Sequence, residues 1–156
     1  MKFRIVAALA LIAASSVHAQ TVAPVPAVDF SVATPQPGSW TYAATADGTE
    51  ATFLDASSHA QLFVRCTRAS RQVTIAKPAT AAAPFLNIWT SSQTRNLPAS
   101  YNPATYRLSA SVTATDPLLD AIAFSRGRFA VGVSGTTALI VPAWEEPARV
   151  IEDCRV

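Results

Sequence analysis

The chain has 156 residues, of which 50% are hydrophobic and 14% are charged, and its formal net charge is +2. This length predicts one domain with a sizeable core. The small net charge excludes the strongly basic surface on which nucleic-acid binding depends.

Residues 1–19 have the pattern of a secretory signal peptide. Lys2 and Arg4 precede an uninterrupted apolar run from Ile5 to Ala14, and Val17-His18-Ala19 fits the small-x-small rule for cleavage before Gln20. The alternative is a membrane anchor, but a spanning helix needs about 20 apolar residues and this run has roughly half of that. We therefore expect a periplasmic or secreted protein with no stable membrane insertion after cleavage.

Cleavage would also change the charge of the protein. Lys2 and Arg4 would leave with the signal peptide, so that ten basic side chains would face ten acidic ones. A neutral chain has no electrostatic preference for nucleic acid or for an anionic membrane. The expected partner is an unknown protein of the envelope or of the extracellular space, in keeping with the expected location.

Residues 20–38 form a proline-rich segment, which predicts an extended lead-in because proline fixes φ and cannot donate a hydrogen bond to a strand ladder. Residues 39–156 are expected to form a single β-rich domain. Eight segments in this part have strand-like patterns: SWTYAA, EATFLD, QLFVRCT, QVTIAK, FLNIWTS, TYRLSASVTA, RFAVGV and TALIV. Alternating apolar and polar residues indicate antiparallel strands with one solvated side. The predicted fold is a mainly β, antiparallel sandwich of about eight strands.

Turn signals connect several of these strands. Asp47-Gly48 is a hairpin signal, because both residue types tolerate a positive φ. The alternation in TYRLSASVTA places Tyr106 on the same apolar face as Leu108. The segment KPATAAAP, residues 77–84, is expected to be a loop bounded by two prolines.

Two short helices are predicted late in the chain. Asp116 can cap the first, Pro117 suits its first position, and Gly127 is placed where a left-handed residue often ends a helix. The second helix is expected to begin at Pro147 and to carry Val150, Ile151 and Cys154 on one face.

Cys66 and Cys154 are the two cysteines of the chain. An even number of cysteines in an exported protein predicts a disulfide. A metal site would need more ligands, and a redox pair would normally have C-x-x-C spacing. We predict one structural disulfide and expect no metal and no cofactor.

Arg126-Gly127-Arg128 has two interpretations. In the structural one, Arg126 lies in the last turn of the first helix, Gly127 ends that helix and Arg128 begins a strand. In the functional one, the two guanidinium groups bind a carboxylate or phosphate. Trp144, in a loop between two prolines, is the tryptophan expected to be exposed.

Catalytic groups are scarce. His59 is the one histidine after residue 19, and it lies in DASSHAQL, which combines Ser, His and Asp in one short segment. A hydrolytic triad is assembled from separate elements, so this segment is expected to be a turn. No catalytic residue is assigned, and we expect that the protein is not an enzyme.

Four stretches carry a resemblance: QLFVRC, IWTSS, TDPLLDAIAFSRGRFAV and EEPARVIEDCR. Together they resemble small uncharacterised secreted bacterial proteins with a single disulfide. More loosely, their order is similar to that of periplasmic accessory proteins of type VI secretion. The resemblance covers residues 39–156 and implies a disulfide-tied β-sandwich that binds a partner without catalysing a reaction.

The expected function is thus a non-enzymatic binding or accessory module of the bacterial cell envelope that acts through protein–protein contacts. One alternative is a small inhibitor of an envelope or exogenous hydrolase that uses residues 142–147 as an exposed loop. Another is an anionic-ligand binder that uses Arg126 and Arg128.

Overall fold

The computed structural model describes residues 29–30 and 32–156. The predicted signal peptide, residues 1–19, and the first part of the predicted lead-in lie outside the described residues. The described part of the chain forms ten β-strands, two α-helices and one short 3-10 helix, Arg68–Ser70.

The larger of two antiparallel sheets has six strands in the order β1-β2-β3-β4-β8-β7. Their bounds are β1 Gly38–Thr45, β2 Gly48–Asp55, β3 Ala60–Thr67, β4 Gln72–Pro78, β7 Ser100–Asn102 and β8 Arg107–Thr113. Leu62, Val64 and Cys66 are all buried on one face of β3, as their alternation predicts.

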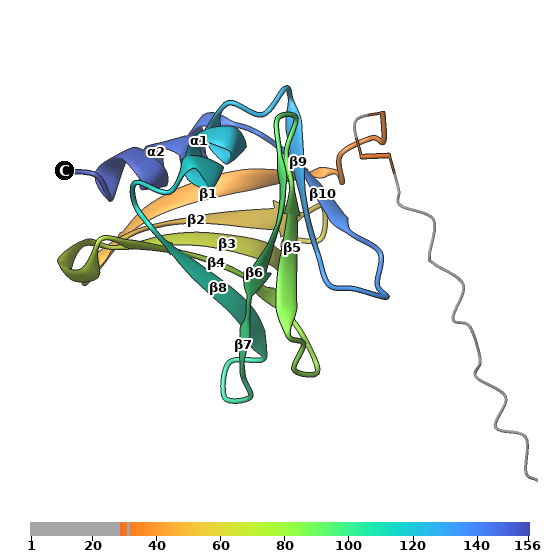
Figure 1. Ribbon diagram of the computed structural model, residues 1–156, viewed down its shortest axis with the longest axis horizontal. Coiled ribbons are helices and arrows are strands. Elements are labelled where there is room, and N and C mark those ends of the chain that lie inside the picture. Colours follow the sequence, from red (N-terminus) through yellow and green to blue (C-terminus); the bar gives the residue numbers. More distant parts are fainter. Residues whose placement is uncertain (1–28, 31) are drawn as a thin grey trace, which may run out of the picture.

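The smaller sheet has four strands in the order β10-β9-β5-β6 and runs steeply across the larger one (Figure 1). Its strands are β5 Phe85–Trp89, β6 Thr94–Pro98, β9 Arg128–Gly132 and β10 Leu139–Pro142. The two sheets meet at Trp40, whose buried indole stacks on Phe129 at a ring-centroid distance of 6.2 Å and donates from Nε1 to the Pro142 carbonyl at 2.9 Å. The predicted antiparallel β-sandwich is confirmed.

Two strands were not expected from the sequence, namely β6 and β7. Both are short, β6 ends in a proline, and neither has a continuous apolar face. They form because β5 and β8 offer them backbone partners. Strand propensity depends on such tertiary context.

The helices α1 Pro117–Ala123 and α2 Glu145–Asp153 lie together near one end of the larger sheet (Figure 1). Asp116 caps α1 as predicted, since its carboxylate accepts the Leu118 N–H at 2.8 Å and Pro117 follows it. Val150 and Ile151 of α2 and the following Cys154 are buried, also as predicted. The disulfide Cys66–Cys154 is confirmed, with 5.4 Å between the two Cα atoms.

Helix boundaries differ from the prediction at two places. Helix α1 ends at Ala123 with Phe124 as its C-cap, so Gly127 does not end the helix and Arg126 is not in its last turn. Gly127 has a positive φ of 73°, but it serves the turn that leads into β9. Helix α2 begins at Glu145, two residues before Pro147, with Trp144 as its N-cap.

The hairpin predicted at Asp47-Gly48 is confirmed by the pairing of β1 with β2, but the role of Gly48 and the place of Tyr106 differ from the prediction. Gly48 is the first residue of β2, where a Cβ would lie 2.1 Å from the Cys66 carbonyl oxygen. Glycine is therefore required there by the close approach of β3, with Ala46 and Asp47 forming the turn. Tyr106 precedes β8, has a φ of +50° and is 66% exposed, so it does not share the inward face of Leu108.

Candidate functional site

The turn between α1 and β9 contains most of the candidate binding residues. Gly127 occupies its centre, and its carbonyl accepts the Ala143 N–H at 3.3 Å. This bond joins the turn to the residue before Trp144. Arg126, Gly127 and Trp144 are therefore brought to one region, although Trp144 is far from the other two in sequence.

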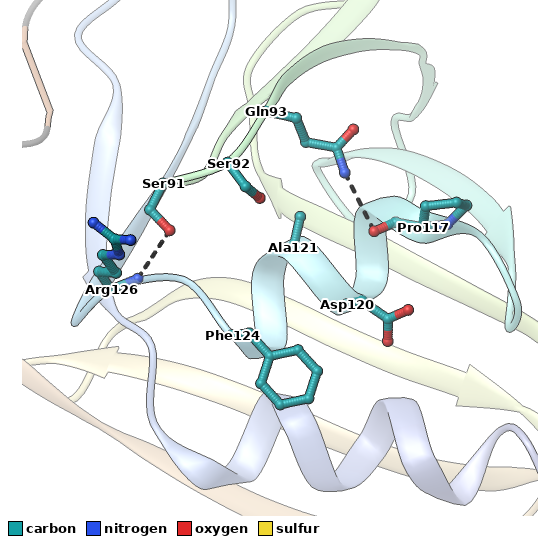
Figure 2. Close-up of a pocket in the computed structure, with 8 residues that line it drawn as sticks. All are labelled: Ser91, Ser92, Gln93, Pro117, Asp120, Ala121, Phe124 and Arg126. Carbon is teal, nitrogen blue, oxygen red and sulfur yellow. Dashed lines mark hydrogen bonds between the residues drawn. The ribbon is translucent and has the colours of Figure 1, made fainter.

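Arg126 lies at the edge of a shallow pocket of about 410 Å³ (Figure 2). Its backbone N–H donates to Ser91 Oγ at 3.1 Å, which fixes the turn against the segment after β5. Its guanidinium group is exposed and makes no hydrogen bond or ion pair with any described residue. The residues that line the pocket are Ser91, Ser92, Gln93, Pro117, Asp120, Ala121, Phe124 and Arg126.

Asp120, the acid in this pocket, already has a partner. Its carboxylate accepts from Arg155 at 2.7 Å, and Arg155 also bonds Glu152 at 2.9 Å and the Ala114 carbonyl at 3.0 Å. The hydrogen bond that Arg155 donates to Asp120 is the main cause that raises the pKa of Arg155. Of the two charged residues that line the pocket, Arg126 is thus the one available to a partner.

Arg128 has different surroundings. It begins β9, is partly buried, and donates from its guanidinium to the carbonyl of Ala33 in the lead-in. Its Nε is buried and has no hydrogen-bond partner among the described residues. The structure therefore gives the two arginines separate neighbours, and Arg128 fixes the chain before β1.

Trp144 is 47% exposed, as predicted for this tryptophan. Phe124, which the sequence analysis did not single out, is 79% exposed. It follows the last residue of α1, and its ring lies on the side of α1 that faces α2 (Figure 2). Helices α1 and α2 contact each other, so their exposed rings belong to the same end of the molecule. We call Phe124, Arg126, Gly127 and Trp144 the aromatic–arginine surface.

Phe124 could have been found from the sequence only by locating the end of α1 correctly. A helix that continued to Arg126 would have included residue 124 within its last turn. Because the helix stops at Ala123, Phe124 is the capping residue and its ring leaves the apolar face formed by Leu118, Leu119 and Ile122.

The segment around His59 forms a turn, as predicted. The Asp55 carboxylate accepts the backbone N–H groups of His59 at 3.0 Å and Ser57 at 2.8 Å, and these bonds, the one from His59 most, lower the pKa of Asp55. The side chain of His59 is 77% exposed, and His59 is not among the residues that line the pockets described here. Over residues 29–30 and 32–156, no three His, Cys, Asp or Glu side chains gather as metal ligands would.

None of the helices among the described residues is long and apolar enough to cross a membrane. In comparisons with known proteins, no family model, no curated protein and no solved structure matches this chain. The functional interpretation therefore rests on the arrangement of the side chains described above.

Proposed function

We propose that this protein is an exported, non-enzymatic binding module of the cell envelope that acts through protein–protein contacts at the aromatic–arginine surface. The observation that carries this proposal is the exposure of two aromatic rings, Phe124 and Trp144, beside the unpaired guanidinium of Arg126.

Aromatic rings and arginine are the side chains that contribute most to protein interfaces. Tryptophan, tyrosine and arginine are enriched among the residues whose truncation costs the most binding energy. An exposed phenylalanine or tryptophan leaves apolar area in contact with water, and burying it against a partner recovers about 25 cal/mol per Å². Arg126 adds a planar donor group that can bind a carboxylate of the partner with two parallel hydrogen bonds.

The scaffold holds this surface in a fixed geometry. Trp144 sits at the start of α2, whose far end is tied to β3 by the Cys66–Cys154 disulfide. Arg126 is fixed through its backbone to Ser91, and Gly127 through its carbonyl to Ala143. A surface that is already ordered loses little conformational entropy when it binds.

Export and an accessory role in the envelope are part of the same proposal. The disulfide supports export, because such bonds persist in oxidising compartments. The accessory role follows the resemblance of residues 39–156 to periplasmic accessory proteins of type VI secretion.

The alternative of an inhibitor loop is less compatible with this geometry. Residues 142–147 do not form a protruding loop: Pro142 ends β10 and residues 145–147 make the first turn of α2. Pro147 is buried. The aromatic–arginine surface is built from two separate segments, so a graft of residues 142–147 alone onto another scaffold should not transfer binding.

Site-specific photocrosslinking in the exporting bacterium tests the proposal. A benzophenone amino acid is placed at position 124 or 144, and at position 85 as a control, because Phe85 is an exposed aromatic residue (45%) on β5. We expect one common protein adduct from positions 124 and 144 and none from position 85. Adducts from position 85 alone, the same adduct from all three positions, or no adduct would contradict the proposal.

The captured partner is then purified and its affinity measured for variants. Trp144→Ala combined with Arg126→Ala should weaken binding about a hundredfold, since two central interface residues commonly cost that much together. Arg68→Ala, at an exposed arginine of the 3-10 helix, is the matched charge control and should leave affinity unchanged. Equal losses in both variants would show that net charge, and not this surface, determines binding.

A further inference from the structure

Lys77 has an unusual place in the larger sheet. It lies near the end of β4 in register with Leu108, and the residues two and four positions before it, Ile75 and Val73, are fully buried on the inward face. The alternation of the strand therefore directs a lysine towards the apolar side of the sheet. Val73 is in register with Cys66, so the disulfide and α2 are at the opposite end of β4.

The end of the sandwich at Lys77 contains an open pocket of about 800 Å³. The loop of residues 78–84, Tyr106 and the connection between β9 and β10 surround it, well away from both helices (Figure 1). Ala79, Ala83 and Val133 line it and pack against the core. Pockets that bind small molecules have volumes of about 300–1,000 Å³ and mostly apolar walls.

Backbone hydrogen bonds fix the rim of this pocket. The Ala79 N–H donates to the Tyr106 carbonyl at 2.9 Å, and the Ala99 N–H donates to the Pro84 carbonyl at 3.0 Å. The loop of residues 78–84 is thus held at both ends. Four of its seven residues are alanine, so its inner surface is made largely of methyl groups.

Tyr106 contributes a second special feature at the rim. Its φ of +50° is in the left-handed region, which an aromatic residue rarely adopts. Such strained residues are concentrated at functional sites, where the surrounding structure maintains them. Here the residue with the strained backbone lines the pocket and is largely exposed.

Charge in the pocket is unbalanced. Of the described residues that line it, Lys77 alone carries a charge, and Tyr106 is the other titratable side chain. Within the described part of the chain, the ammonium group makes one hydrogen bond, a long one of 3.3 Å to the Pro78 carbonyl. Burial of the side chain lowers the pKa of Lys77, because the charged form loses hydration that no carboxylate replaces.

We propose that this pocket binds a small carboxylate with an apolar tail, such as a medium-chain alkanoate. The carboxylate would pair with Lys77 and the tail would lie against the methyl groups of the loop of residues 78–84. A charged hydrogen bond formed in a partly dehydrated site is stronger than one in water. This site is separate from the aromatic–arginine surface and does not depend on the function proposed for it.

Titration calorimetry with octanoate on the exported full-length protein tests the proposal. Octanoate should bind with one site, and 1-octanol, which has the same tail without the charge, should bind about tenfold more weakly. Octylammonium should not bind measurably, because its positive charge would be repelled by the ammonium group of Lys77. Absence of octanoate binding, or equal affinity for octanoate and 1-octanol, would overturn the proposal.

Variants assign the binding to this pocket. Lys77→Met should reduce octanoate affinity about tenfold and leave 1-octanol unchanged, whereas Lys77→Arg should retain most of the affinity. Arg126→Ala is the matched control, since it removes an exposed cation at the other end of the molecule. An unchanged octanoate affinity in Lys77→Met, or a loss in Arg126→Ala, would show that the carboxylate binds elsewhere.

Discussion

Arg126 and Arg128 show how two neighbouring residues of the same type acquire different roles. The Arg126 side chain is solvated, and only its backbone N–H is engaged, with Ser91. The Arg128 guanidinium donates to Ala33, which lies 95 positions earlier in the chain. One arginine is thus available for recognition and the other stabilises the attachment of the lead-in.

Separate alanine substitutions should distinguish these roles. Arg126→Ala should change the free energy of unfolding by no more than about 0.5 kcal/mol, as exposed substitutions do. Arg128→Ala should lower it by about 1 to 2 kcal/mol, because it leaves the Ala33 carbonyl without its charged donor. Urea unfolding of both variants measures the difference. A larger loss for Arg126→Ala than for Arg128→Ala would contradict these assignments.

Lys77 should make stability depend on pH in the alkaline range. Burial lowers its pKa below 10.5, the ordinary value for a lysine, so its charged form destabilises the folded state at neutral pH. As the pH rises through the folded-state pKa, the folded protein releases this proton first, and the unfolded state then binds more protons. Stability therefore rises with pH in the window between the folded-state pKa and 10.5.

Lys77→Met should accordingly be more stable than the parent protein at pH 7, with a difference that shrinks towards pH 10.5. Urea midpoints at several pH values measure this difference, and other titrating groups cancel because both proteins share them. A Tyr106→Phe background removes the other titratable group of the pocket. A difference that stays constant or widens with pH would show that Lys77 is not desolvated.

At the scale of elements, α2 is held in place by three different kinds of contact. Val150 and Ile151 are buried, Cys154 is bonded to Cys66, and Asp153 accepts the Tyr42 hydroxyl at 2.6 Å. That hydrogen bond is the main cause that raises the pKa of Tyr42. A helix of nine residues is too short to be stable in isolation, so these contacts determine whether it forms.

Loss of the disulfide should release α2 before the rest of the domain. Cys154→Ser removes a cross-link between residues 88 positions apart, worth about 4 to 5 kcal/mol in the chain-entropy model. A domain of this size has a total stability of about 5 to 15 kcal/mol. We expect a much lower urea midpoint and early proteolysis near the start of α2, detected by mass spectrometry of the fragments.

Tyr42→Phe is the control for this variant. It removes the hydrogen bond to Asp153 but keeps the ring on which the Arg149 guanidinium lies, 4.1 Å from the ring centroid. It should cost about 1 kcal/mol and leave α2 resistant to proteolysis.

Two free thiols in the denatured exported protein, or a disulfide-linked dimer, would contradict the intramolecular cross-link.

At the scale of the whole molecule, the two candidate binding regions lie at opposite ends of one sandwich. Cys66 and Val73 mark the end that α2 covers, and Lys77 marks the other. The strand ladders between these ends are continuous and antiparallel. A protein partner at one end would therefore leave the Lys77 pocket accessible to a small molecule.

Export should produce a shorter and neutral protein. We expect cleavage after Ala19, because the apolar run from Ile5 to Ala14 fits a signal peptide better than a spanning helix. Intact-mass measurement of protein from the periplasm or the medium should give a chain that begins at Gln20. Retention of residues 1–19 on the exported protein would contradict both the cleavage and the loss of Lys2 and Arg4.

The sequence by itself was sufficient for the elements with strong periodicity. Alternation identified the inward face of β3 through Leu62, Val64 and Cys66, and helical spacing identified the face of Val150, Ile151 and Cys154. With both cysteines on inward faces, the disulfide was predictable as well. These features are local, since a two-residue or 3.6-residue period records which side of an element is buried.

Only the tertiary structure decided which element each buried face packs against and which loops and helix ends lie next to one another. From the sequence, Lys77 is only the polar end of a strand, whereas in the structure it lines one pocket together with the loop of residues 78–84. Phe124 and Trp144 share one end of the molecule because α1 packs on α2 and Gly127 bonds to Ala143. Periodicity shows that a face is covered but carries no information about its partner, so both candidate sites were decided by contacts between residues distant in sequence.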